Sequence, residues 1–173
     1  MTITYVMGVS GVGKSTVAKA MARQLGARLL EGDDYHPAEN IARMSAGKPL
    51  TDAMRVPWLA TVRAAAEQAA ARGDVVVACS GLKAAYRALL AGPDVVMVML
   101  TGDAQTIRAR MAARTDHYMP GALLDSQLAT LELPEAGEPG VICVDADAPP
   151  DKVLQRAMSA RATLLRTRAQ PRK

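Results

Sequence analysis

The chain has 173 residues, of which 50% are hydrophobic and 22% are charged, and its formal net charge is +4. This length and apolar content suit one domain with one buried core, so we expect residues 1–173 to form a single domain. We find no charged-then-apolar leader and no apolar run near the roughly 20 residues that cross a bilayer. We therefore expect a cytoplasmic protein that has no membrane partner.

The positive charge is concentrated at one end of the sequence. From Lys152 onward there are seven basic residues and no acid, which leaves fourteen basic and seventeen acidic residues in 1–151. A basic helix end without interleaved aromatic residues is typical of a solvated face, so we expect no nucleic-acid partner. The two cysteines, Cys79 and Cys143, lie in apolar runs and are expected to be reduced core residues. The sequence leaves a homodimer open.

In chain order, the first predicted strand is the apolar segment 3–7. It leads into Gly8-Val9-Ser10-Gly11-Val12-Gly13-Lys14-Ser15, which matches the G-x-x-x-x-G-K-[ST] phosphate-binding pattern at every position. The next segment, 16–25, has apolar residues at helical spacing. Strand, glycine loop and helix are the context that this motif requires, so we predict a bound nucleoside triphosphate.

The residue types in the loop explain this chemistry. Gly8 and Gly13 allow the backbone to turn so that successive N–H groups face one concavity at a helix N-terminus. Lys14 can reach the β- and γ-phosphates, and the Ser15 hydroxyl can bind the Mg²⁺ that accompanies the nucleotide. The predicted site for ATP and Mg²⁺ comprises Gly8, Val9, Ser10, Gly11, Val12, Gly13, Lys14, Ser15 and Thr16.

Strand and helix patterns alternate through the rest of the chain. Apolar runs predict strands at 27–30, 75–79, 95–100 and 141–144. Helical spacing and breakers predict helices at 38–45, 56–72, 83–90, 103–114, 122–131 and 151–166. This alternation predicts an α/β fold, a doubly wound parallel sheet flanked by helices on both faces.

Acidic residues follow the second predicted strand, at the edge of the sheet where ligands bind. Asp33 is our candidate for a general base that takes the proton from an acceptor hydroxyl. The alternative is that Asp33 and Asp34 cap the helix after Pro37. His36 either contacts the substrate or is a turn residue.

Other features separate a kinase from a GTPase. The chain has no Asn-Lys-x-Asp motif for guanine and no Asp-x-x-Gly switch motif. The predicted strand 75–79 also lacks a terminal Asp for magnesium, an omission that fits small-molecule kinases better. Arg110 and Arg114 lie one turn apart, so both can point at one anion. We predict that they act in catalysis from a lid at about 108–130; the alternative is an exposed face that forms salt bridges.

Longer blocks carry a resemblance to a known family. They are Gly32-Asp33, His36-Pro37, Asn40, Met44, Gly47-x-Pro49-Leu50-Thr51-Asp52, Arg55, Pro57-Trp58-Leu59, Cys79-Ser80-x-Leu82-Lys83-x-x-Tyr86-Arg87, Arg110-x-x-x-Arg114-x-x-His117 and Ser126-Gln127-x-x-x-Leu131-Glu132-x-Pro134. Together they span nearly the whole chain. The sequence resembles the bacterial gluconate kinases, relatives of shikimate kinase.

The resemblance implies phosphorylation of D-gluconate by ATP at its terminal hydroxyl. A polyol with a carboxylate needs cations and polar groups in its site. We expect Arg55, Lys83 and Arg87 to supply the cations, with His36 and Gln127 as hydroxyl partners beside Asp33. In place of the acid that the family usually has before the matched arginine, this chain has Met54.

Alternative interpretations remain at this stage. The proposed cations can be ordinary surface charges. The acceptor can be another small hydroxy acid such as shikimate, or the chain can be a nucleotide-binding regulatory module without acceptor chemistry.

Overall fold

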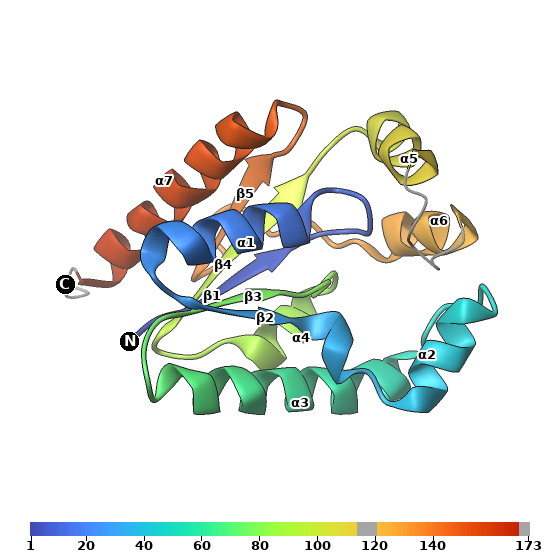
Figure 1. Ribbon diagram of the computed structural model, residues 1–173, viewed down its shortest axis with the longest axis horizontal. Helices are drawn as coiled ribbons and strands as arrows, with labels where there is room; N and C mark the ends of the chain where they lie inside the picture. The colour runs from blue at the N-terminus through green and yellow to red at the C-terminus, as the bar shows by residue number, and fades with distance from the viewer. Residues whose placement is uncertain (114–120, 170–173) are drawn as a thin grey trace.

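The computed structural model describes residues 1–113 and 121–169, and its centre is one parallel sheet (Figure 1). The strands lie in the order β2-β3-β1-β4-β5. Their bounds are β1 Ile3–Met7, β2 Arg28–Glu31, β3 Val75–Ala78, β4 Val95–Thr101 and β5 Val141–Asp145. The first strand is thus the middle of the sheet, paired with β3 on one side and β4 on the other.

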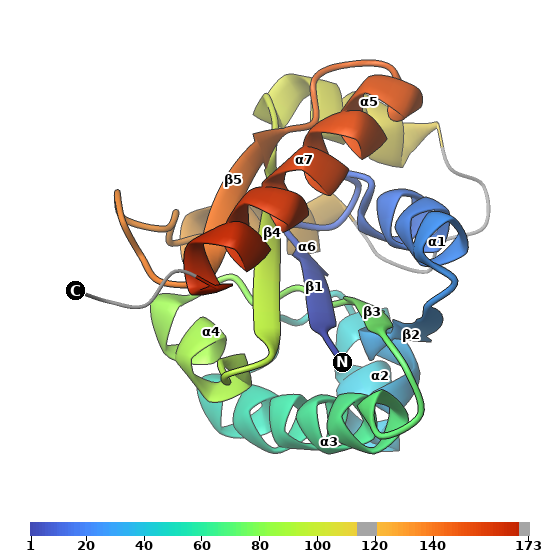
Figure 2. The same cartoon turned by 90° about the vertical axis from the view of Figure 1, so that its left-hand side faces the viewer.

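Helices connect the strands and cover both faces of the sheet. They are α1 Lys14–Leu25, the 3-10 helix η1 Gly32–Tyr35, α2 Ala38–Ser45, α3 Asp52–Ala70, α4 Ala84–Leu90, α5 Ala104–Ala112, α6 Gly121–Thr130 and α7 Pro150–Ala169. Helices α1 and α7 cover one face, and α3 and α4 cover the other (Figures 1 and 2). This arrangement confirms the predicted doubly wound α/β fold. None of the helices within the described residues is long and apolar enough to cross a bilayer.

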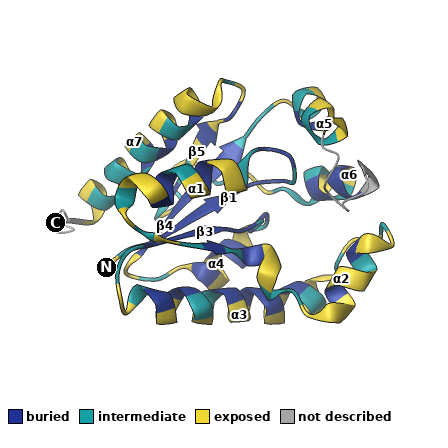
Figure 3. Cartoon of the chain, in the orientation of Figure 1, coloured by how far each residue is buried: buried dark blue, intermediate teal, exposed yellow. Residues whose placement is uncertain are grey.

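Strand alternation divides the core between the two faces. Val6 of β1 packs in the cluster with α1 and α7, whereas Tyr5 and Met7 pack in the cluster with α3. The inner strands β1, β3 and β4 are buried along most of their length, the edge strands β2 and β5 are only partly buried, and the outer sides of the helices are exposed (Figure 3). The continuous apolar runs of β1, β3 and β4 are explained by this burial on both faces.

Three details differ from the sequence expectations. Helix α3 begins at Asp52, about one turn before the predicted start, because the Thr51 hydroxyl accepts a hydrogen bond from the Met54 N–H at 3.3 Å. The acidic residues that follow β2 form the 3-10 helix η1, an element that the sequence did not predict. Cys79 is buried, but Cys143 is exposed because β5 is an edge strand.

Several arginines of α7 have partners within the fold. The Arg161 guanidinium donates to the Thr4 hydroxyl at 3.0 Å and to the Asp74 carboxylate at 2.8 Å. Arg168 donates to the Pro93 carbonyl at 2.7 Å. Part of the basic charge of the C-terminal helix therefore fastens that helix to the body of the protein.

Arg87 of α4 is a second internal fastening. Its side chain is 2% exposed, and its guanidinium donates to both oxygens of Glu138 at 2.6 and 2.7 Å and to the Glu132 carbonyl at 2.7 Å. The guanidinium holds the pKa of the Glu138 carboxyl below its usual range. The segment between α6 and β5 is thereby anchored to α4.

We predict that Arg87→Met lowers the free energy of unfolding by about 3 kcal/mol, because it leaves the Glu138 carboxylate and a backbone carbonyl without their donor. Urea unfolding measures this change. The control is Arg63→Met, which removes an exposed pair with Glu67 and an exposed hydrogen bond to the Leu89 carbonyl and is expected to cost less than about 1 kcal/mol. Equal losses in the two variants would contradict the anchoring role.

Candidate active site

The phosphate loop leaves β1 at the carboxyl edge of the sheet. Gly8 and Gly13 have φ of 136° and 109°, a region that other residues rarely adopt. A Cβ atom on Gly8 would lie 2.6 Å from the Leu100 carbonyl oxygen of β4, so a larger residue does not fit. Helix α1 begins directly at Lys14, whose ammonium donates to the Val9 carbonyl at 3.0 Å. The backbone thus presents a helix N-terminus to an anion, as the motif predicts.

A pocket of about 360 Å³ lies beside this loop, and we call it the outer pocket. Its lining residues are Gly11, Val12, Gly13, Thr16, Val17, Arg110, Ala113, Ala146, Ala148, Pro150 and Val153. The volume lies within the range of small-ligand sites. Arg110 donates to the Ala146 carbonyl at 3.0 Å and so joins α5 to the loop after β5. Arg114, the other predicted lid arginine, lies outside the described residues.

Ser15 and Glu31 form the candidate magnesium site. The Ser15 hydroxyl donates to a Glu31 carboxylate oxygen at 2.9 Å. Burial raises the pKa of Glu31, and the Ser15 hydrogen bond opposes that rise. Hydroxyl and carboxylate oxygens are hard ligands of the kind that Mg²⁺ prefers, so these residues fit the ion.

Glu31 was not predicted as a site residue from the sequence. We looked for a magnesium-binding acid at the end of β3, whereas the acid ends β2, two residues before Asp33. The signal was its position at the carboxyl end of a strand that borders β3 in the sheet.

A second cavity, which we call the inner cavity, lies on the other side of the phosphate loop. Its lining residues are Ser10, Lys14, Asp33, His36, Met44, Pro49, Leu50, Arg55, Trp58, Ser80, Leu123, Ser126 and Gln127. Six predicted site residues, from four segments of the chain, therefore meet in one place: Ser10, Lys14, Asp33, His36, Arg55 and Gln127. The cavity volume is about 30 Å³, roughly the share of one water molecule in the liquid.

Asp33 lies in η1 at the rim of the inner cavity. Its side chain is 57% exposed, and one of its oxygens is 3.9 Å from His36 Nε2. Helix α2 has Pro37 at its N-cap and no side-chain capping bond, so the alternative role of Asp33 and Asp34 as caps of that helix is not observed. The Asp33 carboxylate is therefore placed where it can act on a molecule in the cavity.

His36 is held rigidly next to Asp33. Its side chain is 4% exposed and stacks on Trp58, with ring centroids 4.1 Å apart. Trp58 is in turn fixed by a hydrogen bond from its Nε1 to the Gly32 carbonyl at 2.8 Å. Burial lowers the pKa of His36, and the Asp33 charge opposes this shift while the Arg55 charge adds to it. His36 is therefore neutral at pH 7.

Arg55 supplies positive charge to the inner cavity. It is 9% exposed, and its Nε atom has no hydrogen-bond partner among the residues that the structure describes. Its guanidinium carbon lies 5.9 Å from the centroid of the Tyr86 ring. A buried cation with an unused donor is suited to an anionic group of a ligand.

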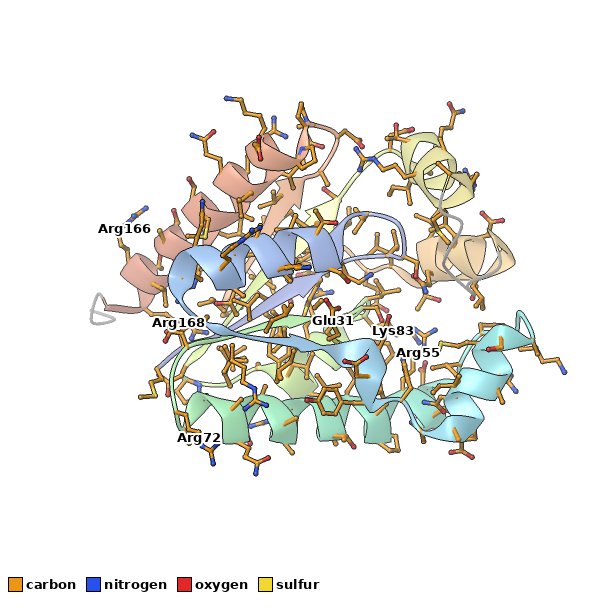
Figure 4. The ribbon with its side chains drawn as sticks, viewed as in Figure 1. Glu31, Arg55, Arg72, Lys83, Arg166 and Arg168 are labelled. Carbon is orange, nitrogen blue, oxygen red and sulfur yellow. The ribbon has the colours of Figure 1, made fainter. Side chains whose placement is uncertain are left out.

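The other two predicted cations do not line the inner cavity. Lys83 donates to both Asp52 oxygens at 2.9 and 2.8 Å, and it lies 5.5 Å from the Tyr86 ring centroid, close to Arg55. Figure 4 shows Lys83, Arg55 and Glu31 at the same edge of the sheet. The structure argues against the predicted substrate contact of Arg87, because its guanidinium is buried against Glu138 instead.

Gln127 connects α6 to the phosphate loop. Its side-chain oxygen accepts a hydrogen bond from the Ser10 N–H at 2.7 Å. Arg108 of α5 and Asp125 of α6 form an ion pair at 2.8 Å. Both described ends of the predicted lid, 108–130, therefore lie over the loop, and closure of the lid stays a prediction.

The phosphate loop has a nucleotide-sized pocket on one side and, on the other, a cavity with a carboxylate and a buried cation. This arrangement defines the class of P-loop small-molecule kinases. A family model described as an AAA domain matches residues 3–134. The chain is 47% identical over 153 residues to a gluconokinase of Gluconobacter oxydans, an alignment that covers 87% of this chain and 85% of the relative.

Two further relatives agree. The thermosensitive gluconokinase of Escherichia coli is 43% identical over 143 residues, with 81% of this chain and 76% of the relative covered. The crystal structure of a gluconokinase from Sinorhizobium meliloti has a TM-score of 0.85, is 43% identical in sequence and covers 98% of both chains. The chain belongs to the gluconokinase family.

The role of Glu31 predicts a specific magnesium phenotype. We expect Glu31→Gln to raise the Mg²⁺ concentration needed for half-maximal ATP turnover by about tenfold, because the amide is a weaker partner for the ion. Glu39→Gln, which changes an acid in the first turn of α2, is the matched control. Unchanged magnesium dependence in Glu31→Gln would remove Glu31 from the site.

The lowered pKa of His36 predicts a pH dependence of stability. In the unfolded chain, His36 takes up a proton near pH 6.5, whereas in the folded protein it does so only at lower pH. The contribution of neutral His36 to the free energy of unfolding is therefore fully present above pH 6.5 and is lost as the pH falls. We expect the melting temperature of His36→Gln to fall less between pH 7 and pH 5.5 than that of the parent protein. Equal losses in thermal unfolding would show that His36 is not held neutral.

Proposed function

We propose that the protein is a gluconokinase that transfers the γ-phosphate of ATP to the terminal hydroxyl of D-gluconate, giving 6-phospho-D-gluconate. Relatives named gluconokinase align with this chain over most of their length. The observation that carries the proposal is the meeting of Lys14, Asp33 and Arg55 around one cavity. A phosphate-binding lysine, a base and a cation for a carboxylate are the three groups that this reaction needs.

The phosphate side of the reaction uses the loop and α1. The loop N–H groups and Lys14 hold the phosphates, with the base and ribose of ATP in the outer pocket. Ser15 and Glu31 would hold Mg²⁺, which neutralises charge on the β- and γ-phosphates when it is bound. Arg110 lines the outer pocket, and we propose that it acts with Arg114 on the charge of the transferred group.

The acceptor side uses the inner cavity. Asp33 accepts the proton of the acceptor hydroxyl as its oxygen forms a bond to the γ-phosphorus and the bond to the ADP oxygen breaks. We assign the acceptor carboxylate to the Arg55 guanidinium. Lys83 lies at the same Tyr86 ring as Arg55, so its positive charge would also attract the acceptor carboxylate, although Lys83 is paired with Asp52. Gln127 and His36 are placed to bind hydroxyl groups.

The small volume of the inner cavity supports a reaction that excludes water. Because the cavity must widen for a six-carbon acid and then close, the transferred phosphoryl group is shielded from hydrolysis.

Both cysteines are unpaired, as is typical of the reducing cytoplasm, which supports the predicted location. The absence of a nucleic-acid partner stays a prediction.

The direct test is ADP release with MgATP and a panel of D-gluconate, shikimate, other sugar acids and nucleoside monophosphates. We expect strong turnover with gluconate and none in Lys14→Ala. Asp33→Asn is expected to lower kcat by about 10²-fold or more while ATP still binds. Turnover of another acid alone would contradict the assigned acceptor, and nucleotide binding without any ADP release would contradict the kinase.

A further inference from the structure

Asn40 is a buried polar residue that contacts the site without lining it. It lies in α2 and is 0% exposed. Its side-chain nitrogen Nδ2 is 3.2 Å from His36 Nδ1 and 3.5 Å from the Met54 carbonyl oxygen of α3. Its Oδ1 atom has no hydrogen-bond partner among the residues that the structure describes. A buried amide with an unsatisfied oxygen is costly, so its position calls for a reason.

These contacts fix the orientation of the Asn40 amide. The Met54 carbonyl is always an acceptor, so its contact with Asn40 at 3.5 Å, the upper limit of a hydrogen bond, favours the NH₂ nitrogen as the atom that faces it. The same nitrogen faces His36 Nδ1. That ring nitrogen must then carry a lone pair, because two donors cannot face each other at this distance. In a neutral imidazole, the proton is consequently on Nε2.

The protonated nitrogen is the one that faces the reaction. His36 Nε2 is 3.9 Å from the nearer Asp33 oxygen, and both residues line the inner cavity. This gap is longer than a hydrogen bond, and it leaves room for a hydroxyl oxygen that contacts both groups. A donor on one side of that oxygen and a carboxylate on the other match the two needs of an acceptor hydroxyl.

We propose that Asn40 is a positioning residue that locks His36 in its neutral Nε2–H form, so that His36 donates to the acceptor hydroxyl oxygen while Asp33 takes its proton. In the other tautomer, Nε2 would present a lone pair toward Asp33 and compete for the same proton. Stacking on Trp58 fixes the plane of the ring, and Asn40 fixes which nitrogen carries the proton. The charged groups that face His36 are Asp33 of η1 and Arg55 of α3.

The first test observes the tautomer without any substrate. The chain has two histidines, His36 and His117, so ¹⁵N spectra of histidine-labelled protein are simple, and His36→Gln identifies the signals of His36. We expect the His36 signals of a protonated Nε2 and an unprotonated Nδ1 at pH 7 to 8. In Asn40→Asp, the new carboxylate accepts a proton from Nδ1, and we expect Nδ1 to become protonated. A protonated Nδ1 in the parent protein would overturn the proposal.

The second test measures the consequence for turnover and rests on the proposed kinase function. We expect Asn40→Asp and Asn40→Leu each to lower kcat by about tenfold or more with the KM for ATP unchanged. The pH profile of Asn40→Asp should gain an ionisation that the parent lacks. The control is Thr4→Val, which removes an equally buried polar group at the far end of β1 and should leave the profile unchanged.

The outcomes distinguish the positioning role of Asn40 from the proposed kinase function. Parent-like kcat in Asn40→Asp with a shifted tautomer would overturn the positioning role while leaving the kinase function intact. If the parent protein turns over no acceptor, the kinase function fails, and the spectra still decide the tautomer. Melting temperatures of both Asn40 variants show whether a loss of turnover reflects unfolding, and two folded variants with parent-like kcat would also refute the proposal.

Discussion

The close approach of the phosphate loop to β4 is the constraint on which the rest of the structure depends. The loop turns at Gly8 directly against the Leu100 carbonyl, at the point where the central strand of the sheet ends. This contact sets the height of the loop amides and of Lys14 above the sheet. The strands on either side of β1 end at the same edge of the sheet, so the segments that follow them can reach the phosphate loop.

Two sets of residues then approach the loop from opposite sides. Helix α5 and the segment after β5 form the outer pocket, whereas η1, α2 and α3 form the inner cavity with α6. Buried polar groups hold the second set in place: Trp58 bonds the backbone of Gly32, and His36 stacks on Trp58. The Asp33 carboxylate, which we propose as the general base, is thus exposed but lies beside a rigid support, and this would limit the reorganisation needed during the reaction.

Much of this arrangement was predictable from the sequence. Periodicity and breakers located the strands and helices to within a few residues, because buried parallel strands are uniformly apolar. The phosphate loop was predictable because its geometry depends on glycines at fixed positions. Arg87 was misjudged because its partner Glu138 is distant in sequence, and pattern alone cannot show that a cation is already paired. The roles that we propose for Glu31 and Asn40 were not predicted for the same reason: they rest on contacts with Ser15 and His36 that form only in the fold.

The division of the site between two sides of the loop has an evolutionary consequence. One stretch, residues 32–58, carries Asp33, His36 and Arg55 of the inner cavity, while the outer pocket that we propose for the nucleotide is lined by residues elsewhere in the chain. Mutations in that stretch can alter which alcohol is recognised without disturbing the phosphate donor. In a fold organised in this way, changes confined to one segment can alter the acceptor while the segments on the nucleotide side stay the same.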